Sequence, residues 1–284
     1  MKLSTTISTL LTLVGVGVFG SSIVAQAGSR APDSFEFKVI LKNPLFDSNS
    51  KNSRIDDFKK ILEEQPGIVV KEDKKEKSRV VSYLDTVGCD LRNNNYILRK
   101  RFTLKGGVPD SLKVTLKYRS DTSDEVRSKK FKAKPSSDLT ATKFEIDVVK
   151  GPSSQTRKKF SYSGSVELGK IKNIYQLKSL YPVISELGIN DKRKLKKVNG
   201  FTAFESVVEL GTIKIAGQKC EASFSFWYET REKTDPFVSE FSYVCNKYTS
   251  KAQKLYQAIL GLEDWVKDGL SAKTAIAYGN YCNN

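Results

Sequence analysis

Histidine is absent from the whole 284-residue chain. A Ser-His-Asp triad, a Cys-His pair and any metal site built on imidazole are therefore excluded. The chemistry open to this chain rests on carboxylates, on Lys and Arg, on hydroxyl groups, or on a hard metal ion held by oxygen ligands.

Long apolar runs are also scarce, with one exception near the N-terminus. Residues 10–19 are mostly apolar, and Ala25-Gln26-Ala27 follows with the small-x-small spacing of a signal-peptidase site. We expect residues 1–27 to be a signal peptide, and the protein to be exported to the periplasm or the extracellular space. An uncleaved anchor is the weaker alternative, because a membrane span needs about 20 apolar residues. Residues 28–284 are expected to form a single domain without a later membrane span.

Only four cysteines are present. In an exported chain they are expected to form disulfides, and four cysteines allow three pairings. Residues 219–247 alternate like two strands around a Pro-containing turn, with Cys220 and Cys245 equally far from that turn. We therefore predict a Cys220–Cys245 disulfide, which leaves Cys89 to pair with Cys282. Free buried thiols are the alternative.

Anionic residues are in the minority, since 32 Asp and Glu stand against 48 Lys and Arg, giving a net charge of +16. This excess favours an anionic partner, whether nucleic acid, a phosphate compound or an acidic surface. Nucleic acid is the least favoured of these. Phe224 and Phe226 share a strand face with Cys220, so we expect them to pack in the core rather than to stack on bases.

Strict alternation of polar and apolar residues is what the chain has in quantity. In SLKVTLKYRS, residues 111–120, the polar positions Lys113, Thr115, Lys117 and Arg119 alternate with apolar ones, which is the two-residue period of a strand. Residues 34–41 and 142–149 repeat the pattern. One interpretation is a sheet with its charged face in water. The other is a barrel with an ionic lining, whose apolar outer faces are covered by helices.

Helical spacing is found in four places. We expect a helix over residues 53–65 with Ser53 as its N-cap, and one over 174–187 that breaks at Pro182. A third is expected over 251–269, ending near Gly269, and a short last one over 271–280. Segments rich in Lys, Ser and Asp at 71–79, 120–140 and 150–160 are interpreted as solvated turns.

Five strand motifs follow one another along the chain: SFEFK at 34–38, YLDT at 83–86, LRKR at 98–101, TLKYR at 115–119 and TKFEID at 142–147. In this order they resemble the CYTH-like, or triphosphate tunnel metalloenzyme, superfamily, over about residues 33–281. The resemblance implies an α+β fold in which an antiparallel, eight-stranded β-barrel forms a tunnel with an ionic interior, flanked by a few α-helices.

The resemblance also implies a site inside the tunnel. Its phosphate-binding cations are Lys38, Arg99, Arg101, Lys117, Arg119 and Lys143, and its ligands for Mg²⁺ or Mn²⁺ are Glu36, Glu145, Asp147 and Glu240. Planar and point cations suit phosphate oxygens, and hard divalent ions suit carboxylates. No residue is assigned as a general acid or base. The alternative role for these carboxylates is to pair with the interior cations.

Two departures leave the function open between classes. Ser34 stands where the family pattern has its first Glu, and Ser242 follows Glu240 where a second carboxylate is expected. The first hypothesis is an exported tunnel protein that binds inorganic polyphosphate, triphosphate or an organic phosphoester and hydrolyses it with a divalent metal. The second is a non-catalytic envelope protein that binds an acidic ligand in or on the same scaffold. A basic surface that adheres to acidic polymers is a third possibility.

Overall fold

The computed structural model describes residues 31–129, 131, 139–151, 155–167, 171–269 and 272–282. The expected signal peptide at 1–27 lies outside these residues. The region from Pro32 to Asn284 is one compact unit. In the described part of it, no helix has the length and apolar character needed to cross a membrane.

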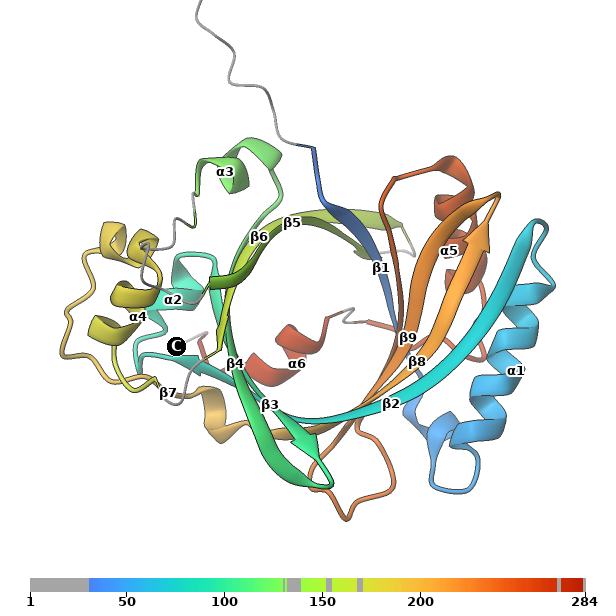
Figure 1. The fold of residues 1–284 in the computed structure, drawn as a ribbon, viewed down its shortest axis with the longest axis horizontal. Coiled ribbons are helices and arrows are strands. Elements are labelled where there is room, and N and C mark those ends of the chain that lie inside the picture. The colour runs from blue at the N-terminus through green and yellow to red at the C-terminus, as the bar shows by residue number, and fades with distance from the viewer. Residues whose placement is uncertain are drawn as a thin grey trace, which may run out of the picture. The chain divides into compact units, whose positions relative to one another are not determined.

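Ten strands form one sheet in the described part of the chain. They are β1 (Ser34–Leu41), β2 (Ile68–Asp85), β3 (Tyr96–Lys105), β4 (Val108–Ser120), β5 (Leu139–Lys150), β6 (Thr156–Glu167), β7 (Lys196–Lys197), β8 (Ala203–Ile215), β9 (Gln218–Tyr228) and β10 (Val238–Cys245). The order is β3-β4-β6-β5-β1-β10-β9-β8-β2, and a further pairing of β2 with β3 closes the ring, while β7 pairs with β2 outside it (Figure 1).

The expected α+β tunnel fold is confirmed, with two differences in detail. Nine strands close the ring instead of eight, and the pairing of β1 with β5 is parallel, whereas the other pairings are antiparallel. The parallel pair arises because the first strand enters the ring between β5 and β10, which are distant in sequence. No local pattern in the sequence specifies that neighbour.

Residues 71–79 are not a turn, which corrects the sequence-based expectation. They continue β2, an 18-residue strand that pairs with β8 along most of its length. The register shifts between Glu72 and Lys75, opposite Gly211 on β8. Gly211 has a φ of +105°, and a Cβ there would lie 2.3 Å from the carbonyl oxygen of Lys71, so this close crossing requires glycine.

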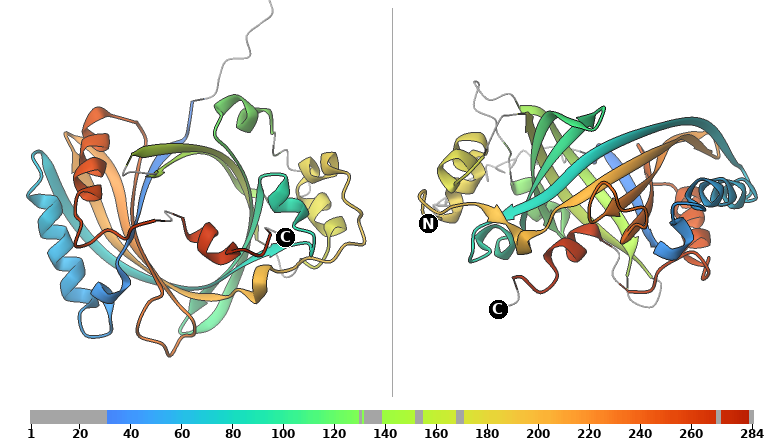
Figure 2. Two further views of the ribbon diagram at one scale, coloured as in Figure 1. Left: turned by 180° about the vertical axis from the view of Figure 1, so that it is seen from behind. Right: turned by 90° about the horizontal axis from the view of Figure 1, so that it is seen from below.

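The helices lie outside the ring, except for the last one (Figures 1 and 2). They are η1 (Asn43–Phe46), α1 (Lys51–Glu63), α2 (Asp90–Asn93), α3 (Ser123–Ser128), α4 (Ile174–Leu180), η3 (Pro182–Leu187), η4 (Val198–Gly200), α5 (Ser250–Leu260) and α6 (Lys273–Tyr278). Helix α6 lies within the outline of the ring when seen down its axis, and at one end of the strands in the side view.

The apolar faces of the strands point outward under these helices. Leu112, Val114, Leu116 and Tyr118 of β4 belong to a core that includes residues of α4 and η3. A second core joins α1 and α5 to the outer faces of β8, β9, β10 and β1. Burial of these two apolar layers supplies the main driving force for folding, and it leaves the opposite strand faces turned toward the inside of the ring.

The expected helices are found with shifted ends. The N-cap of α1 is Ser50, and Ser53 is inside the helix, donating its hydroxyl hydrogen to the Ser50 carbonyl. The break at Pro182 and the short last helix are confirmed. Helix α5 ends at Leu260 rather than near Gly269, because the chain turns there and brings Val266 to a bridge with Leu41 of β1.

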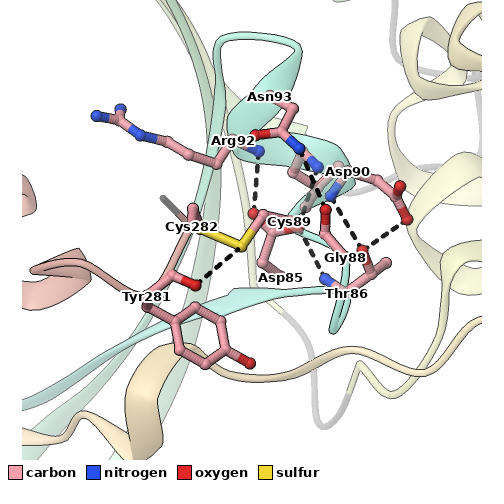
Figure 3. Close-up of a disulfide and its surroundings, with 10 residues drawn as sticks. Asp85, Thr86, Gly88, Cys89, Asp90, Arg92, Asn93, Tyr281 and Cys282 are labelled. Atoms are coloured by element: carbon pink, nitrogen blue, oxygen red, sulfur yellow. Dashed lines mark hydrogen bonds between the residues drawn. A yellow bond between two sulfur atoms is a disulfide. The ribbon is translucent and has the colours of Figure 1, made fainter. Parts of the chain in front are cut away.

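Both expected disulfides are present. Cys220 and Cys245 face each other directly across the β9–β10 hairpin, with 4.4 Å between their Cα atoms. Cys89 and Cys282 join the start of α2 to the segment that follows α6 (Figure 3). No described cysteine is free. The second bridge therefore ties the C-terminal segment to the wall of the ring.

Candidate functional site

The ring encloses a cavity of about 1760 Å³. Alternate residues of β4, from Ser111 through Lys113, Thr115 and Lys117 to Arg119, line it, as the strand period requires. Among the described residues that line the cavity, thirteen are Lys or Arg and eight are Asp or Glu, an excess of five cations. The charged faces of the strands therefore meet one another inside the ring.

The ten residues singled out from the sequence as phosphate and metal ligands all line this cavity. They are Lys38, Arg99, Arg101, Lys117, Arg119, Lys143, Glu36, Glu145, Asp147 and Glu240. Their convergence is a property of the fold, and their roles in binding remain predictions.

Asp147 on β5 is the centre of one cluster of charges. Its carboxylate lies 2.9 Å from the Nζ of Lys38, 3.0 Å from a guanidinium nitrogen of Arg119 and 3.9 Å from the Nζ of Lys117. The parallel β1–β5 pairing sets Asp147 opposite Glu36, which in turn lies 2.8 Å from the Nζ of Lys38. Asp147 is thus surrounded by three cations in the wall of the cavity.

Glu145 continues this cluster two residues earlier on β5. Its carboxylate oxygens lie 2.7 Å from the Nζ of Lys143 and 3.3 Å from that of Lys117. The hydroxyl of Ser34 donates a hydrogen bond to Glu145 over 3.3 Å. A glutamate at position 34 would instead place a second negative charge beside Glu145, so Ser34 leaves the cluster less acidic.

The pKa values in this cluster follow from its cations. Burial alone would raise the pKa of Asp147, but Lys117, Lys38 and Arg119 lower it well below its usual range. Glu145 behaves likewise, because Lys117 and Lys143 outweigh its burial and lower its pKa. Burial opposes the charge of Lys38, yet Asp147 and Glu36 raise its pKa. All three groups are therefore charged at neutral pH.

Glu205 on β8 is the centre of a second cluster, which the sequence did not reveal. The carboxylate is 1% exposed and lies 3.3 Å from the Nζ of Lys273, 3.5 Å from Arg79 and 3.7 Å from Arg101. It also accepts hydrogen bonds from Ser225 and from the indole nitrogen of Trp227. Burial would raise the pKa of Glu205, but these neighbours, chiefly Arg101 and Lys273, lower it well below its usual range.

Lys273 connects helix α6 to β8 and β10, the two strands that flank β9 in the ring. Its Nζ lies 2.9 Å from Glu240 on β10 and 3.3 Å from Glu205 on β8. The next residue, Thr274, accepts a hydrogen bond from Arg119 at 3.4 Å. Ala272, Lys273, Thr274 and Ala275 line the cavity, so α6 forms part of its boundary at that end. Sequence patterns predicted this helix but not its place inside the ring.

Arg99 on β3 differs from the other cations of the cavity. Among the described residues, no carboxylate lies within ion-pair distance of Arg99, and no hydrogen-bond acceptor contacts its buried Nε. Burial, followed by the charge of Arg101, lowers the pKa of Arg99 to about 10. The Nε atoms of Arg101 and Arg119 are likewise buried without a hydrogen-bond partner. The cavity therefore contains buried cationic donors that an anion would satisfy.

The four carboxylates predicted as metal ligands do not fit a resident divalent ion. Each is already paired with at least one Lys or Arg. In the described part of the chain, the one group of three potential ligand atoms within 4.8 Å of one another is Asp85 with Cys89 and Cys282. The two sulfur atoms of that group are bonded to each other, which removes them as thiolate ligands.

Asp85, in the YLDT motif, has a structural role outside the cavity (Figure 3). Its carboxylate accepts hydrogen bonds from the backbone N–H groups of Thr86, Leu91 and Arg92, and so holds the turn that begins α2. Burial raises the pKa of Asp85 to about 6, despite these hydrogen bonds. The motif thus contributes Tyr83 to the cavity lining and Asp85 to the support of the wall.

No family model and no curated protein matches this chain. Several solved structures are similar to it. A protein from Hippeastrum, described as a candidate adenylyl cyclase with a dominant triphosphatase activity, has a TM-score of 0.47 and 14% identity, with 86% of this chain and 95% of that chain covered. A candidate adenylate cyclase from Bacillus halodurans has a TM-score of 0.43 and 13% identity, over 87% of this chain and 98% of that one.

A further structure, the PH1819 protein of Pyrococcus horikoshii, has a TM-score of 0.36 and 11% identity, over 82% of this chain and 94% of that chain. At these identities and TM-scores, the function is inferred from the side chains of this chain.

Proposed function

We propose that the central cavity binds a linear, phosphate-rich anion such as triphosphate, inorganic polyphosphate or an organic phosphoester. The observation that carries this proposal is Arg99, a half-buried arginine whose buried Nε has no hydrogen-bond acceptor and whose guanidinium has no carboxylate partner among the described residues. A buried charge without a partner costs free energy, and an anionic ligand would supply the missing partner.

The surroundings of Arg99 suit phosphate oxygens. A small space beside it is lined by the cations Arg99, Lys117 and Arg119 and by the hydroxyl-bearing residues Tyr83, Thr115 and Thr274. Guanidinium groups bind two phosphate oxygens at once, while ammonium and hydroxyl groups donate single hydrogen bonds. The space is only about 20 Å³, so it admits a single phosphate oxygen, which would meet charge and hydrogen-bond donors from three strands and from α6.

The size of the cavity favours a ligand longer than a single phosphate. Its volume of about 1760 Å³ exceeds the 300–1,000 Å³ of an ordinary small-molecule site. The clusters around Asp147 and Glu205 add further cations, among them Lys38 and Arg101, to the lining of the same cavity. A chain of phosphoryl groups would use both sets, and the excess of cations would attract it from solution.

Calorimetric titration with tripolyphosphate tests this proposal. We expect one binding site per chain, an affinity that falls with added salt, and a large loss of affinity when Lys117 and Arg99 are replaced together by Ala. Release of inorganic phosphate, measured with and without Mg²⁺ or Mn²⁺, separates hydrolysis from binding. Binding that persists in the double variant would contradict this site.

A non-catalytic binding protein is the second candidate, and the pairing of the carboxylates favours it. Ser34 and Ser242 stand where the family pattern suggests acidic ligands; the Ser34 hydroxyl donates to Glu145, and the Ser242 hydroxyl lies 3.4 Å from that of Ser223. In phosphoryl transfer, positioned metal ions and charge stabilisation supply most of the catalysis. Tight tripolyphosphate binding without phosphate release under any metal condition would support this candidate.

We also propose that the protein is exported, with residues 1–27 removed as a signal peptide. Two disulfides support this, because such bridges persist in oxidising compartments. Fractionation of the producing cell, followed by mass spectrometry of the mature N-terminus, tests the proposal. A chain that begins at Met1 and stays in the cytoplasm would contradict it.

A further inference from the structure

We propose that two lysine ammonium groups, those of Lys38 and Lys273, take the place of divalent metal ions in the cavity, which then binds its anion without a resident metal. This inference rests on the proposed function and specifies how the site achieves it. It departs from the Mg²⁺ or Mn²⁺ site that the sequence resemblance implies.

The first ammonium group lies between two carboxylates that had been predicted to hold a metal. The Nζ of Lys38 is 2.8 Å from an oxygen of Glu36 and 2.9 Å from an oxygen of Asp147. Its side chain is 13% exposed, and that of Asp147 is 2% exposed. Two oxygens from different strands around one shielded positive charge are what a small cation would otherwise require.

The second ammonium group repeats the arrangement farther along the cavity. The Nζ of Lys273 is 2.9 Å from Glu240 on β10 and 3.3 Å from Glu205 on β8. Lys273 comes from α6, so it reaches the two glutamates from the end of the ring and not from a strand. Two separate parts of the fold thus place an ammonium group between a pair of acids.

The remaining acid of the predicted metal set is neutralised in the same way. Glu145 contacts the ammonium groups of Lys117 and Lys143. A divalent ion could bind these carboxylates only by displacing a lysine from them, which would leave a shielded ammonium group without its partners. It would also add positive charge to a lining that already has an excess of five cations.

The consequence for binding is that the cations which meet the ligand are supplied by the chain itself. Arg99, together with the Nε groups of Arg101 and Arg119, which have no hydrogen-bond acceptor among the described residues, provides donors for phosphate. The ammonium groups provide the charge that neutralises the acids. Free Mg²⁺ forms complexes with tripolyphosphate in solution, so it should compete with the protein for the ligand instead of assisting it.

The first experiment titrates wild-type protein with tripolyphosphate in EDTA and again with excess Mg²⁺. We expect stoichiometric binding in EDTA and an apparent Kd that is unchanged or larger with Mg²⁺. Binding that appears only with Mg²⁺, or that strengthens tenfold or more with it, would overturn the inference while leaving the proposed function intact. Absence of binding under both conditions would refute the proposed function instead.

The second experiment needs no phosphate, and it measures Mn²⁺ binding by the loss of the electron paramagnetic resonance signal of free Mn²⁺. We expect no stoichiometric site in the wild type. Lys38→Met and Lys273→Met each remove the one ammonium group that lies between a pair of acids, and each variant should bind Mn²⁺ at least tenfold more tightly than the wild type. Lys143→Met is the matched control, and its affinity for Mn²⁺ should not increase, because Lys143 contacts a single carboxylate.

Circular dichroism identifies any variant that fails to fold, and the wild-type titrations stand without the variants. The inference would be contradicted if the wild type bound one Mn²⁺ per chain and the Glu36→Gln, Asp147→Asn double variant did not. So would Lys38→Met and Lys273→Met variants that fold and gain no Mn²⁺ affinity.

Discussion

Replacement of Arg99 by Gln separates the binding role of this residue from any structural one. The guanidinium makes no ion pair with a described carboxylate, and burial lowers its pKa to about 10, so the charge is poorly accommodated in the free protein. Gln keeps hydrogen-bond donors and a similar side-chain shape without the charge. The variant should therefore fold as well as the wild type, or better, and bind tripolyphosphate worse.

The two effects have different expected sizes. A hydrogen bond to a charged group contributes about 1.5–3 kcal/mol, so the loss of the Arg99 contact should weaken tripolyphosphate binding roughly 10- to 100-fold. Removal of a half-buried charge that has no ion-pair partner should leave the free energy of unfolding unchanged or raise it by up to about 2 kcal/mol. Calorimetric titration measures the first effect, and urea unfolding followed by circular dichroism measures the second.

Two other Arg→Gln variants serve as controls. Arg119→Gln removes the 3.0 Å contact with Asp147, so it should lower both affinity and stability. Arg54→Gln changes a side chain on α1 that is 44% exposed, and neither quantity should move. The reasoning is refuted if Arg99→Gln binds tripolyphosphate like the wild type, or if it is destabilised as much as Arg119→Gln.

Three further predictions concern stability. Glu205→Gln leaves the cations around this residue without their anion and should lower the free energy of unfolding by about 3–5 kcal/mol, measured by urea denaturation. A decrease smaller than the error of that measurement would contradict the role of Glu205 as the anion of the second cluster. Because the pKa values of Glu145 and Asp147 are lowered on folding, their contribution to stability is complete above about pH 4.5 and is lost as pH falls below their unfolded values. Thermal melts between pH 3 and pH 7 should show this slope, and the Glu145→Gln, Asp147→Asn double variant should flatten it. Replacing Cys89 and Cys282 by Ser should lower the free energy of unfolding by about 2–5 kcal/mol and release α6 from the wall of the ring. Brief trypsin digestion should then cleave the chain after Lys273 in the variant but not in the wild type.

The lining of the cavity could be predicted from the sequence because it depends on local alternation. Once a segment such as 111–120 is a strand, Lys113, Lys117 and Arg119 share a face whatever the tertiary structure. The apolar partners decide which face is covered by helices. For this reason all ten predicted ligands lie on the inner surface, and the hairpin register that pairs Cys220 with Cys245 could be predicted as well.

The second charge cluster could not be predicted, because it depends on contacts between distant segments. Glu205 and Lys273 are 68 positions apart, and they meet because α6 lies across one end of the ring. The strand containing Glu205 lacks clean alternation, since Val207 and Val208 follow one another there. The pairing of the predicted metal ligands was only partly open to prediction. Lys38 and Lys143 lie two positions from their acids on the same strands, and the sequence allowed such pairs. Lys117 and Lys273 reach their acids from β4 and from α6, which no local pattern shows.

The length of β2 was missed for a different reason. Residues 71–79 are so polar that their composition resembles a solvated turn, yet they pair with β8. Their charged side chains form ion pairs on the surface: Glu72 pairs with Lys59 of α1, and Lys77 pairs with Glu209 of β8. Backbone pairing with a neighbouring strand thus outweighed the local preference for a turn.

A crystal structure of the protein with tripolyphosphate, grown in the presence of EDTA, would show where the anion binds and which side chains hold it. We predict that the anion lies inside the ring, with phosphate oxygens at hydrogen-bond distance from Arg99 and from Lys117 or Arg119, and with Lys38 still between Glu36 and Asp147. An anion bound only on the outer surface of the ring, with the side chains of the cavity as they are now, would contradict the account.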